Sequence, residues 1–157
     1  MNYNVMNPQD APNAKLAEGF ITIGNNRYNM FSAKNFEAVD SVTNADVNSI
    51  GRLRTGHKAV GLDGSFSMTI YHVTAIFEKI IKEFEETGVM PTFDIQVTSY
   101  DPATSIGTDT KIYTGCQIDG DIKLSDFDAE GEFREQDVEG FFNSWKSASE
   151  YTNPAGM

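Results

Sequence analysis

The sequence lacks the features of a secreted or membrane-spanning protein. Its single cysteine, Cys116, excludes an internal disulfide and fits a reducing compartment. No long uncharged apolar run is present, so we expect no membrane-spanning helix and no membrane anchor. Residues 1–15 are polar and contain no apolar segment of the kind found in signal peptides. These absences predict synthesis in the cytoplasm without a signal peptide.

Groups that carry out catalysis are also scarce. His57 and His72 are the two histidines, and their spacing from each other and from Cys116 is not that of metal ligands. Nothing near them suggests a Ser or Cys nucleophile with an orienting acid. The glycine-rich stretch around Gly51 and Gly56 lacks the Gly-Lys-Ser/Thr of a phosphate-binding loop. The sequence therefore predicts that the protein is not an enzyme and has no catalytic, cofactor-binding or metal-binding residue.

Acidic residues outnumber basic ones, and the two kinds occupy different parts of the chain. The 157 residues carry 23 acids and 12 bases, a net charge of −11, which argues against nucleic-acid binding over the general surface. Residues 119–139 hold nine acids against two bases, whereas residues 48–62 contain Arg52, Arg54 and Lys58 and no acid. This asymmetry indicates a partner of complementary charge, and an identical subunit can be that partner.

The length predicts one domain. We expect a flexible N-terminal arm (1–15), a folded body (16–148) and a flexible C-terminal tail (149–157). A Gly/Asn turn at residues 24–26 predicts a hairpin, and the glycine-rich segment 44–64 is predicted to protrude as one long hairpin that extends its flanking strands. Trp145 and Phe141 are interpreted as strand core. Alternation of apolar and polar residues predicts further strands at 32–43, 65–73, 92–100, 110–118, 120–133 and 136–147.

Residues 74–87 are predicted to form the one helix. Thr74 can cap its start and Gly88 its end. The apolar side chains that recur at helical spacing are Ile76, Phe77, Ile80, Ile81 and Phe84. These elements predict a mainly β (α+β) domain in which one helix packs against antiparallel strands.

The stretch LSDFDAEGEFREQD, residues 124–137, matches a calcium-binding loop at five positions. However, no helical pattern precedes it, and the twelfth position, where a bidentate Glu is expected, is Asp137. Apolar and acidic residues alternate along the stretch, which favours a strand over a metal loop. The acidic face of that strand would require good solvation, because like charges repel. It comprises Asp126, Asp128, Glu130 and Glu132.

The central block SIGRLRTGHKAVGLDGSFSMTIYHVTAIFEKII resembles that of the PBSX-like phage tail tube proteins. That family has a G-x-x-x-T-G-x-K segment, a glycine-rich turn, an alternating strand that ends in Tyr-x-Val-Thr/Ser, and a helix. The matching positions are Gly51, Thr55, Gly56 and Lys58, then Gly61 and Gly64, then Tyr71, Val73 and Thr74. The resemblance extends over residues 14–148, whereas the final strand, EGFFNSW, departs from the family's Phe-Thr-Phe pattern.

The resemblance implies two packed antiparallel β-sheets, forming a sandwich or barrel, with one flanking helix. It implies hexameric rings whose inner sheets join into a continuous barrel and which stack into a hollow tube. Sheath, baseplate and tail-terminator proteins are the implied partners. The implied location is the tail of a phage or a phage-tail-like contractile particle, made in the bacterial host cytoplasm. Such a tube passes DNA or punctures an envelope, and an acidic lumen would not hold DNA.

Two surfaces are assigned to assembly on this basis. Asp46, Arg52, Arg54, His57 and Lys58 are predicted contacts between subunits or rings, in which the bases meet acids of the neighbouring ring. The face of Asp126, Asp128, Glu130 and Glu132 is predicted to line either the lumen or the seam between rings. Two alternatives stay open: a small-ligand-binding β-barrel protein, which would be a monomer with an apolar cavity, and a tube-like protein of a secretion system.

Overall fold

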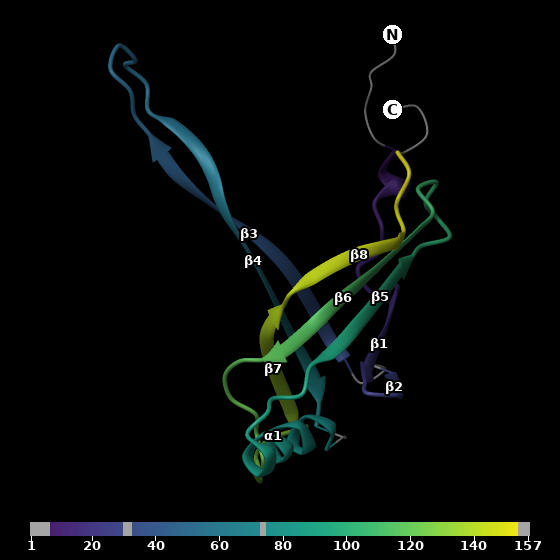
Figure 1. Cartoon of the computed structure of the whole chain (residues 1–157). Coiled ribbons are helices and arrows are strands. Elements are labelled where there is room, and N and C mark those ends of the chain that lie inside the picture. The colour runs from purple at the N-terminus through teal and green to yellow at the C-terminus, as the bar shows by residue number, and fades with distance from the viewer. Residues whose placement is uncertain (1–6, 30–32, 73–74, 154–157) are drawn as a thin grey trace.

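The computed structural model describes residues 7–29, 33–72 and 75–153, which form antiparallel β-structure with one α-helix (Figure 1). The predicted mainly β class with a single helix is confirmed within these ranges. The elements are η1 (Pro8–Asp10), β1 (Ala17–Ile23), β2 (Asn26–Asn29), β3 (Ala33–Val47), β4 (Gly56–Tyr71), α1 (Ile76–Thr87), β5 (Phe93–Tyr100), β6 (Thr108–Ile118), β7 (Glu135–Phe142) and β8 (Ser144–Ser149).

The eight strands of the described residues belong to one hydrogen-bonded sheet. Its order is β2-β1-β5-β6-β7-β4-β3, and β8 pairs with β6 outside this path. Strand β6 is the junction, because it pairs with β5 along most of its length and with β8 through residues 110–114, but with β7 only through Gln117 and Ile118. The sheet is therefore not a closed barrel, and the expected division into two sheets is not confirmed, since β6 joins the two halves.

The core lies where the two halves of the sheet face each other. Phe66 on β4 meets Phe93 on β5 edge to face, with ring centroids 6.0 Å apart. The ring centroids of Tyr113 on β6 and Phe142 on β7 are 5.1 Å apart. Burial of apolar surface thus holds the halves together where the β6–β7 ladder is short. Four strands supply the largest fully buried side chains: Met68, Ile95, Val138 and Cys116.

Helix α1 covers one end of this core. Phe77 is buried beneath the helix, with its ring centroid 6.4 Å from that of Phe93. Gly88 ends the helix in the left-handed conformation, at φ 74°, and its N–H donates to the carbonyl of Phe84 at 2.8 Å. The predicted helix and its C-terminal cap are therefore confirmed. The predicted N-terminal cap, Thr74, lies outside the described residues.

Strands β3 and β4 form the long hairpin that was predicted around residues 44–64. Their pairing continues as far as Val47 opposite Gly56, well beyond the buried core residues. Residues 48–55 make the turn, and Figure 1 shows the hairpin projecting away from the rest of the molecule. The prediction that extended flanking strands build a protruding hairpin is confirmed.

The predicted strand at residues 120–133 is wrong. Residues 119–134, here called the acidic loop, connect β6 to β7 without regular secondary structure. Within the loop, a carboxylate oxygen of Asp128 accepts from the N–H of Glu130 at 3.0 Å, and the carbonyl of Asp128 accepts from the N–H of Gly131 at 3.2 Å. Such side-chain bonds to nearby backbone compete with a strand ladder, so alternation of residue type alone did not produce a strand here.

The predicted strand at residues 136–147 is two strands. The chain leaves β7 for β8 at Asn143, whose N–H donates to the carbonyl of Thr114 at 3.0 Å. Trp145 and Phe141 therefore lie on different strands, and both are exposed at 45%, so their interpretation as core residues is wrong.

Candidate assembly surfaces

The hairpin tip, residues 48–55, exposes apolar and basic side chains together. Ile50 and Leu53 are completely exposed, and Arg52 and Arg54 lie among them. Exposed apolar side chains gathered in this way are typical of surfaces that bind other proteins. Further exposed apolar side chains of the same hairpin include Val42, Val47, Val60 and Leu62.

The structure places all five predicted contact residues on the hairpin. Arg52 and Arg54 lie in the tip, and Lys58 lies on β4 just below it. Asp46 and His57 face each other across the two strands, with His57 Nδ1 3.0 Å from Asp46 Oδ1 and both side chains exposed. Asp46 and His57 therefore already pair within one subunit, which leaves Arg52, Arg54 and Lys58 as the predicted contact residues that this pair does not involve.

The acidic loop does not present the predicted acidic strand face. Asp126 binds Lys123 at 3.1 Å and Asp128 bonds within its own turn, whereas Glu130 and Glu132 are exposed. The loop also exposes apolar side chains between its acids, namely Leu124, Phe127 and Phe133. It therefore offers a mixed acidic and apolar surface, as the hairpin tip offers a mixed basic and apolar one.

The hairpin tip and the acidic loop lie at opposite ends of the molecule. Figure 1 shows the tip as the farthest point of the β3–β4 hairpin, while α1 and the segment that leads into β7 lie at the other end. A hydrogen bond of 2.9 Å from the N–H of His72 to the carbonyl of Arg134 fixes the end of the loop beside the end of β4. Surfaces of complementary composition thus point in opposite directions.

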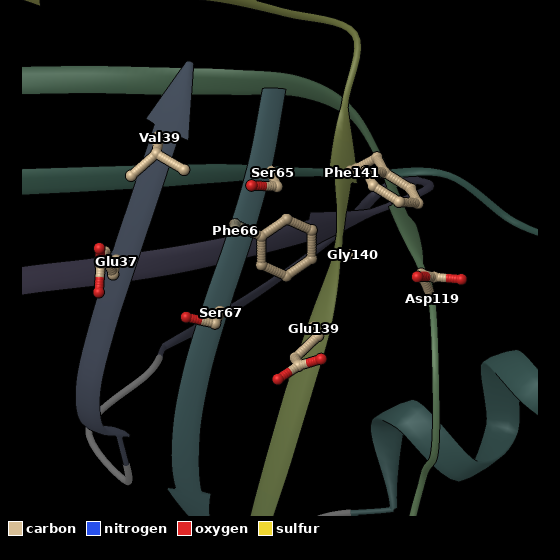
Figure 2. A pocket seen from close by; sticks show the side chains of 9 residues that line it. All are labelled: Glu37, Val39, Ser65, Phe66, Ser67, Asp119, Glu139, Gly140 and Phe141. Carbon is tan, nitrogen blue, oxygen red and sulfur yellow. The ribbon is translucent and has the colours of Figure 1, made fainter. Parts of the chain in front are cut away.

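A polar face on the outward side of β3, β4 and β7 was not predicted as a site. The register of the strands places Glu37, Ser67 and Glu139 in one row. Ser65 lies in the next row, between the exposed side chains of Val39 and Phe141, and Figure 2 shows these residues and Asp119 around a hollow of about 250 Å³. Alternating polar positions in SFSMTIYHV and EQDVEGFF carried the signal. We call Glu37, Ser65, Ser67, Asp119 and Glu139 together the polar face.

The one cysteine is not available for chemistry at the surface. Cys116 is fully buried on β6, and this burial raises the pKa of its thiol to about 12. In the part of the chain that the structure describes, no group of three or more His, Cys, Asp or Glu residues is arranged to hold a metal ion. Among the same residues, no helix has the length and apolarity that a bilayer crossing requires.

The fold and these surfaces define a class of protein: a β-structured subunit that exposes apolar and charged surfaces suited to other chains. A family model described as phage tail tube protein matches residues 4–148. In Bacillus subtilis (strain 168), the phage-like element PBSX protein XkdM is 30% identical to the chain and the uncharacterized protein YqbM 31%. Each match extends over 109 residues, or 69% of this chain and 74% of the relative. The chain belongs to the phage tail tube protein family and is a structural tail tube subunit.

Solved structures share the fold at low sequence identity. A chain of the PVC sheath-tube complex in its extended state, from an extracellular contractile injection system, is similar with a TM-score of 0.62 and 9% identity. That match covers 83% of this chain and 88% of the other. A chain of the anti-feeding prophage baseplate gives a TM-score of 0.60 and 9% identity, covering 83% and 91%. These likenesses show a common fold.

Proposed function

We propose that six copies of this subunit form a ring and that identical rings stack into the hollow tube of a contractile tail. The observation that carries the proposal is the placement of a basic, apolar hairpin tip and an acidic, apolar loop at opposite ends of the subunit. Stacking of identical rings requires two different surfaces that fit each other, one on each end. Membership of the tail tube family supports the tube, and the resemblance supports six as the number of subunits.

Ring closure is assigned to the edge of β3. This strand is last in the order of the sheet, so one of its edges has no partner strand among the described residues. β3 runs for 15 residues from Ala33 to Val47, and such a long free edge is a hazard unless another strand covers it. Pairing β3 with the neighbouring subunit would remove the hazard and join the β3–β4–β7 halves into one continuous barrel.

The polar face is assigned to the lumen of that barrel. It lies on the outward side of the three strands that would form the barrel wall, and it carries the carboxylates of Glu37, Asp119 and Glu139 around two serines. An acidic wall repels the DNA backbone and leaves a passing duplex free to move. The same wall suits a tail-like particle that carries no DNA and punctures an envelope.

The acidic loop from residue 120 onward is assigned to the seam between rings, because it lies at an end of the subunit. Arg52, Arg54 and Lys58 of one ring would meet the acids of this loop in the next. Ile50 and Leu53 would cover its exposed Phe127 and Phe133. Opposite charges would set the register and the encounter rate, while burial of the apolar side chains would supply most of the affinity.

Sheath, baseplate and tail-terminator proteins are the proposed partners of the tube, and the particle tail is its proposed location. The similar chains come from a sheath-tube complex and a baseplate, as their descriptions state. A tube-like protein of a secretion system would share the ring and differ in these partners. A ligand-binding β-barrel receives no support from a sheet that stays open.

The double variant Arg52→Glu/Arg54→Glu tests the stacking surface. We expect it to keep the native circular dichroism spectrum and unfolding midpoint and to form no tubes by electron microscopy at high concentration, with or without wild-type tube fragments as seeds. Lys146→Glu, which reverses one positive charge on the distant strand β8, should assemble like the wild type. Normal tube growth by the double variant would overturn the assignment of the tip.

A further inference from the structure

A buried histidine joins three elements at the acidic-loop end of the molecule. His72 follows β4, and its side chain is only 8% exposed. Its Nε2 lies 2.8 Å from Glu78 Oε1 on α1, and its Nδ1 lies 3.1 Å from a terminal guanidinium nitrogen of Arg134, the last residue of the acidic loop. The spacing of His72 in the sequence does not indicate these contacts, so the cluster is a product of the tertiary fold.

The two contacts define the protonation state of the ring. A guanidinium only donates hydrogen bonds, so Nδ1 accepts from Arg134 and carries no proton. Nε2 then carries the proton and donates it to the carboxylate of Glu78. His72 is therefore neutral in this arrangement. A second proton would occupy Nδ1, remove the acceptor of Arg134 and place two positive charges about 3 Å apart.

Arg134 in turn holds the acidic loop. Its guanidinium carbon lies 4.5 Å above the ring centre of Phe127, in the middle of the loop. Its Nε atom is buried without a hydrogen-bond partner among the described residues, so the contact with His72 is a main anchor of this side chain. Phe133 of the loop also meets Tyr71 of β4 edge to face, at 6.2 Å between ring centroids.

We propose that protonation of His72 releases the acidic loop, so that the His72–Glu78–Arg134 cluster acts as a proton-sensitive latch. With Nδ1 protonated, Arg134 loses its acceptor, moves away from the histidine and no longer supports Phe127. His72 is thus a positioning residue, which acts on the loop through Arg134. The consequence for ring stacking rests on the proposed function, because it requires the loop to lie in the seam.

Two charged groups contact the buried ring of His72, namely Glu78 of α1 at Nε2 and Arg134 of the acidic loop at Nδ1. Tyr71 on β4 and Glu135 on β7 are the adjacent titratable residues, and the carboxylate of Glu135 is already bound by Lys34 of β3 at 2.9 Å.

Hydrogen exchange of the dispersed subunit, followed by mass spectrometry, tests the latch without any tube. After correction for intrinsic rates, the amides of residues 124–133 should exchange roughly tenfold faster at about pH 5 than at about pH 7.5, because a hydrogen bond to a charged group is lost. The variant His72→Gln keeps polar contacts but cannot titrate, so its loop should exchange equally at both values.

The other histidine supplies the matched control. His57→Gln changes an exposed residue of the hairpin, so the loop of this variant should respond to pH as the wild type does. An identical pH response of the loop in the wild type and in His72→Gln would overturn the latch. So would a wild-type loop that does not respond. Loop release is measured on single subunits and does not depend on tubes. A failure of every variant to form tubes would therefore count against the proposed function and not against the latch.

Discussion

The indole Nε1 of Trp145 donates a 2.6 Å hydrogen bond to the carboxylate of Asp40. Trp145 lies on β8 and Asp40 on β3, so this bond links the two halves of the sheet at the end away from α1. Both residues line a hollow of about 300 Å³ that also borders Leu62 and Phe142. A residue first assigned to the core is thus a polar bridge at the open end of the fold.

Removing this bridge should weaken the native state modestly. Asp40→Ala leaves the indole without its acceptor, and we expect the free energy of unfolding to fall by about 1 kcal/mol. Trp145 is the one tryptophan, so its emission reports on the site and on denaturant unfolding alike. Asp63→Ala, which lies beside the same hollow but does not bond the indole, is the control and should change stability by less than about 0.5 kcal/mol. Equal effects of the two changes would contradict the bridge.

Gly140 should tolerate no side chain. A Cβ at this position would overlap the carbonyl oxygen of Gln117 and crowd the ring of Phe66 at 2.9 Å. Gly140→Ala would therefore separate β6 from β7, where the two halves join, and we expect a loss of about 3 kcal/mol in chemical unfolding. Gly61→Ala is the matched control, because its Cβ would make only an ordinary contact of 3.7 Å with Thr43. A Gly140→Ala protein as stable as this control would show that the junction can move.

The apolar part of the hairpin tip should matter for assembly and not for folding. Ile50→Ser/Leu53→Ser removes two completely exposed side chains, so the free energy of unfolding should stay within about 0.5 kcal/mol of the wild type. Sedimentation at high concentration should show subunits or single rings in place of tubes, because the apolar contact at the seam is lost. Val89→Ser, an exposed apolar residue beyond α1, should assemble normally. Long tubes from the double variant would show that the apolar side chains of the tip are not needed for assembly and that only its charges contribute.

Cys116 should be unreactive in the folded protein. At about pH 8.5 we expect iodoacetamide to modify the native thiol about a hundredfold more slowly than the urea-unfolded one, because burial keeps it protonated. The pKa is raised from 9.0 to about 12, so its contribution to stability is complete below pH 9 and is lost as the pH rises toward 12. The Cys116→Val variant should therefore lose less stability than the wild type between about pH 9 and about pH 11. Parallel losses in both proteins would contradict this assignment.

Local sequence patterns predicted the elements that depend mainly on residues close together in the chain or on a regular alternation of apolar and polar residues. The helical spacing of Phe77 and Ile80 and the left-handed Gly88 specify α1 before any tertiary contact forms. Alternation in β4, with Phe66 and Met68 facing inward, likewise specifies a strand with one buried face. The five predicted contact residues fell on one hairpin because they are close in sequence.

The same alternation failed in the acidic loop, because a strand also needs a partner strand. The loop follows β6 at the point where that strand changes partner, and Asp128 satisfies nearby backbone N–H groups instead. The cluster of His72 with Glu78 and Arg134 was not predictable either. Arg134 lies 62 residues from His72, and no local pattern indicates that contact.

The sequence by itself determined the helix, the long hairpin, the separation of basic and acidic segments and the membership of the tail tube family, because each depends on neighbouring residues or on a short motif. Only the tertiary structure decided that β6 joins the halves of one sheet, that the polar face gathers on β3, β4 and β7, and that Trp145 and His72 bridge distant elements. These features arise from strand register and packing between residues far apart in the chain, where small differences in burial and hydrogen bonding select one partner among many.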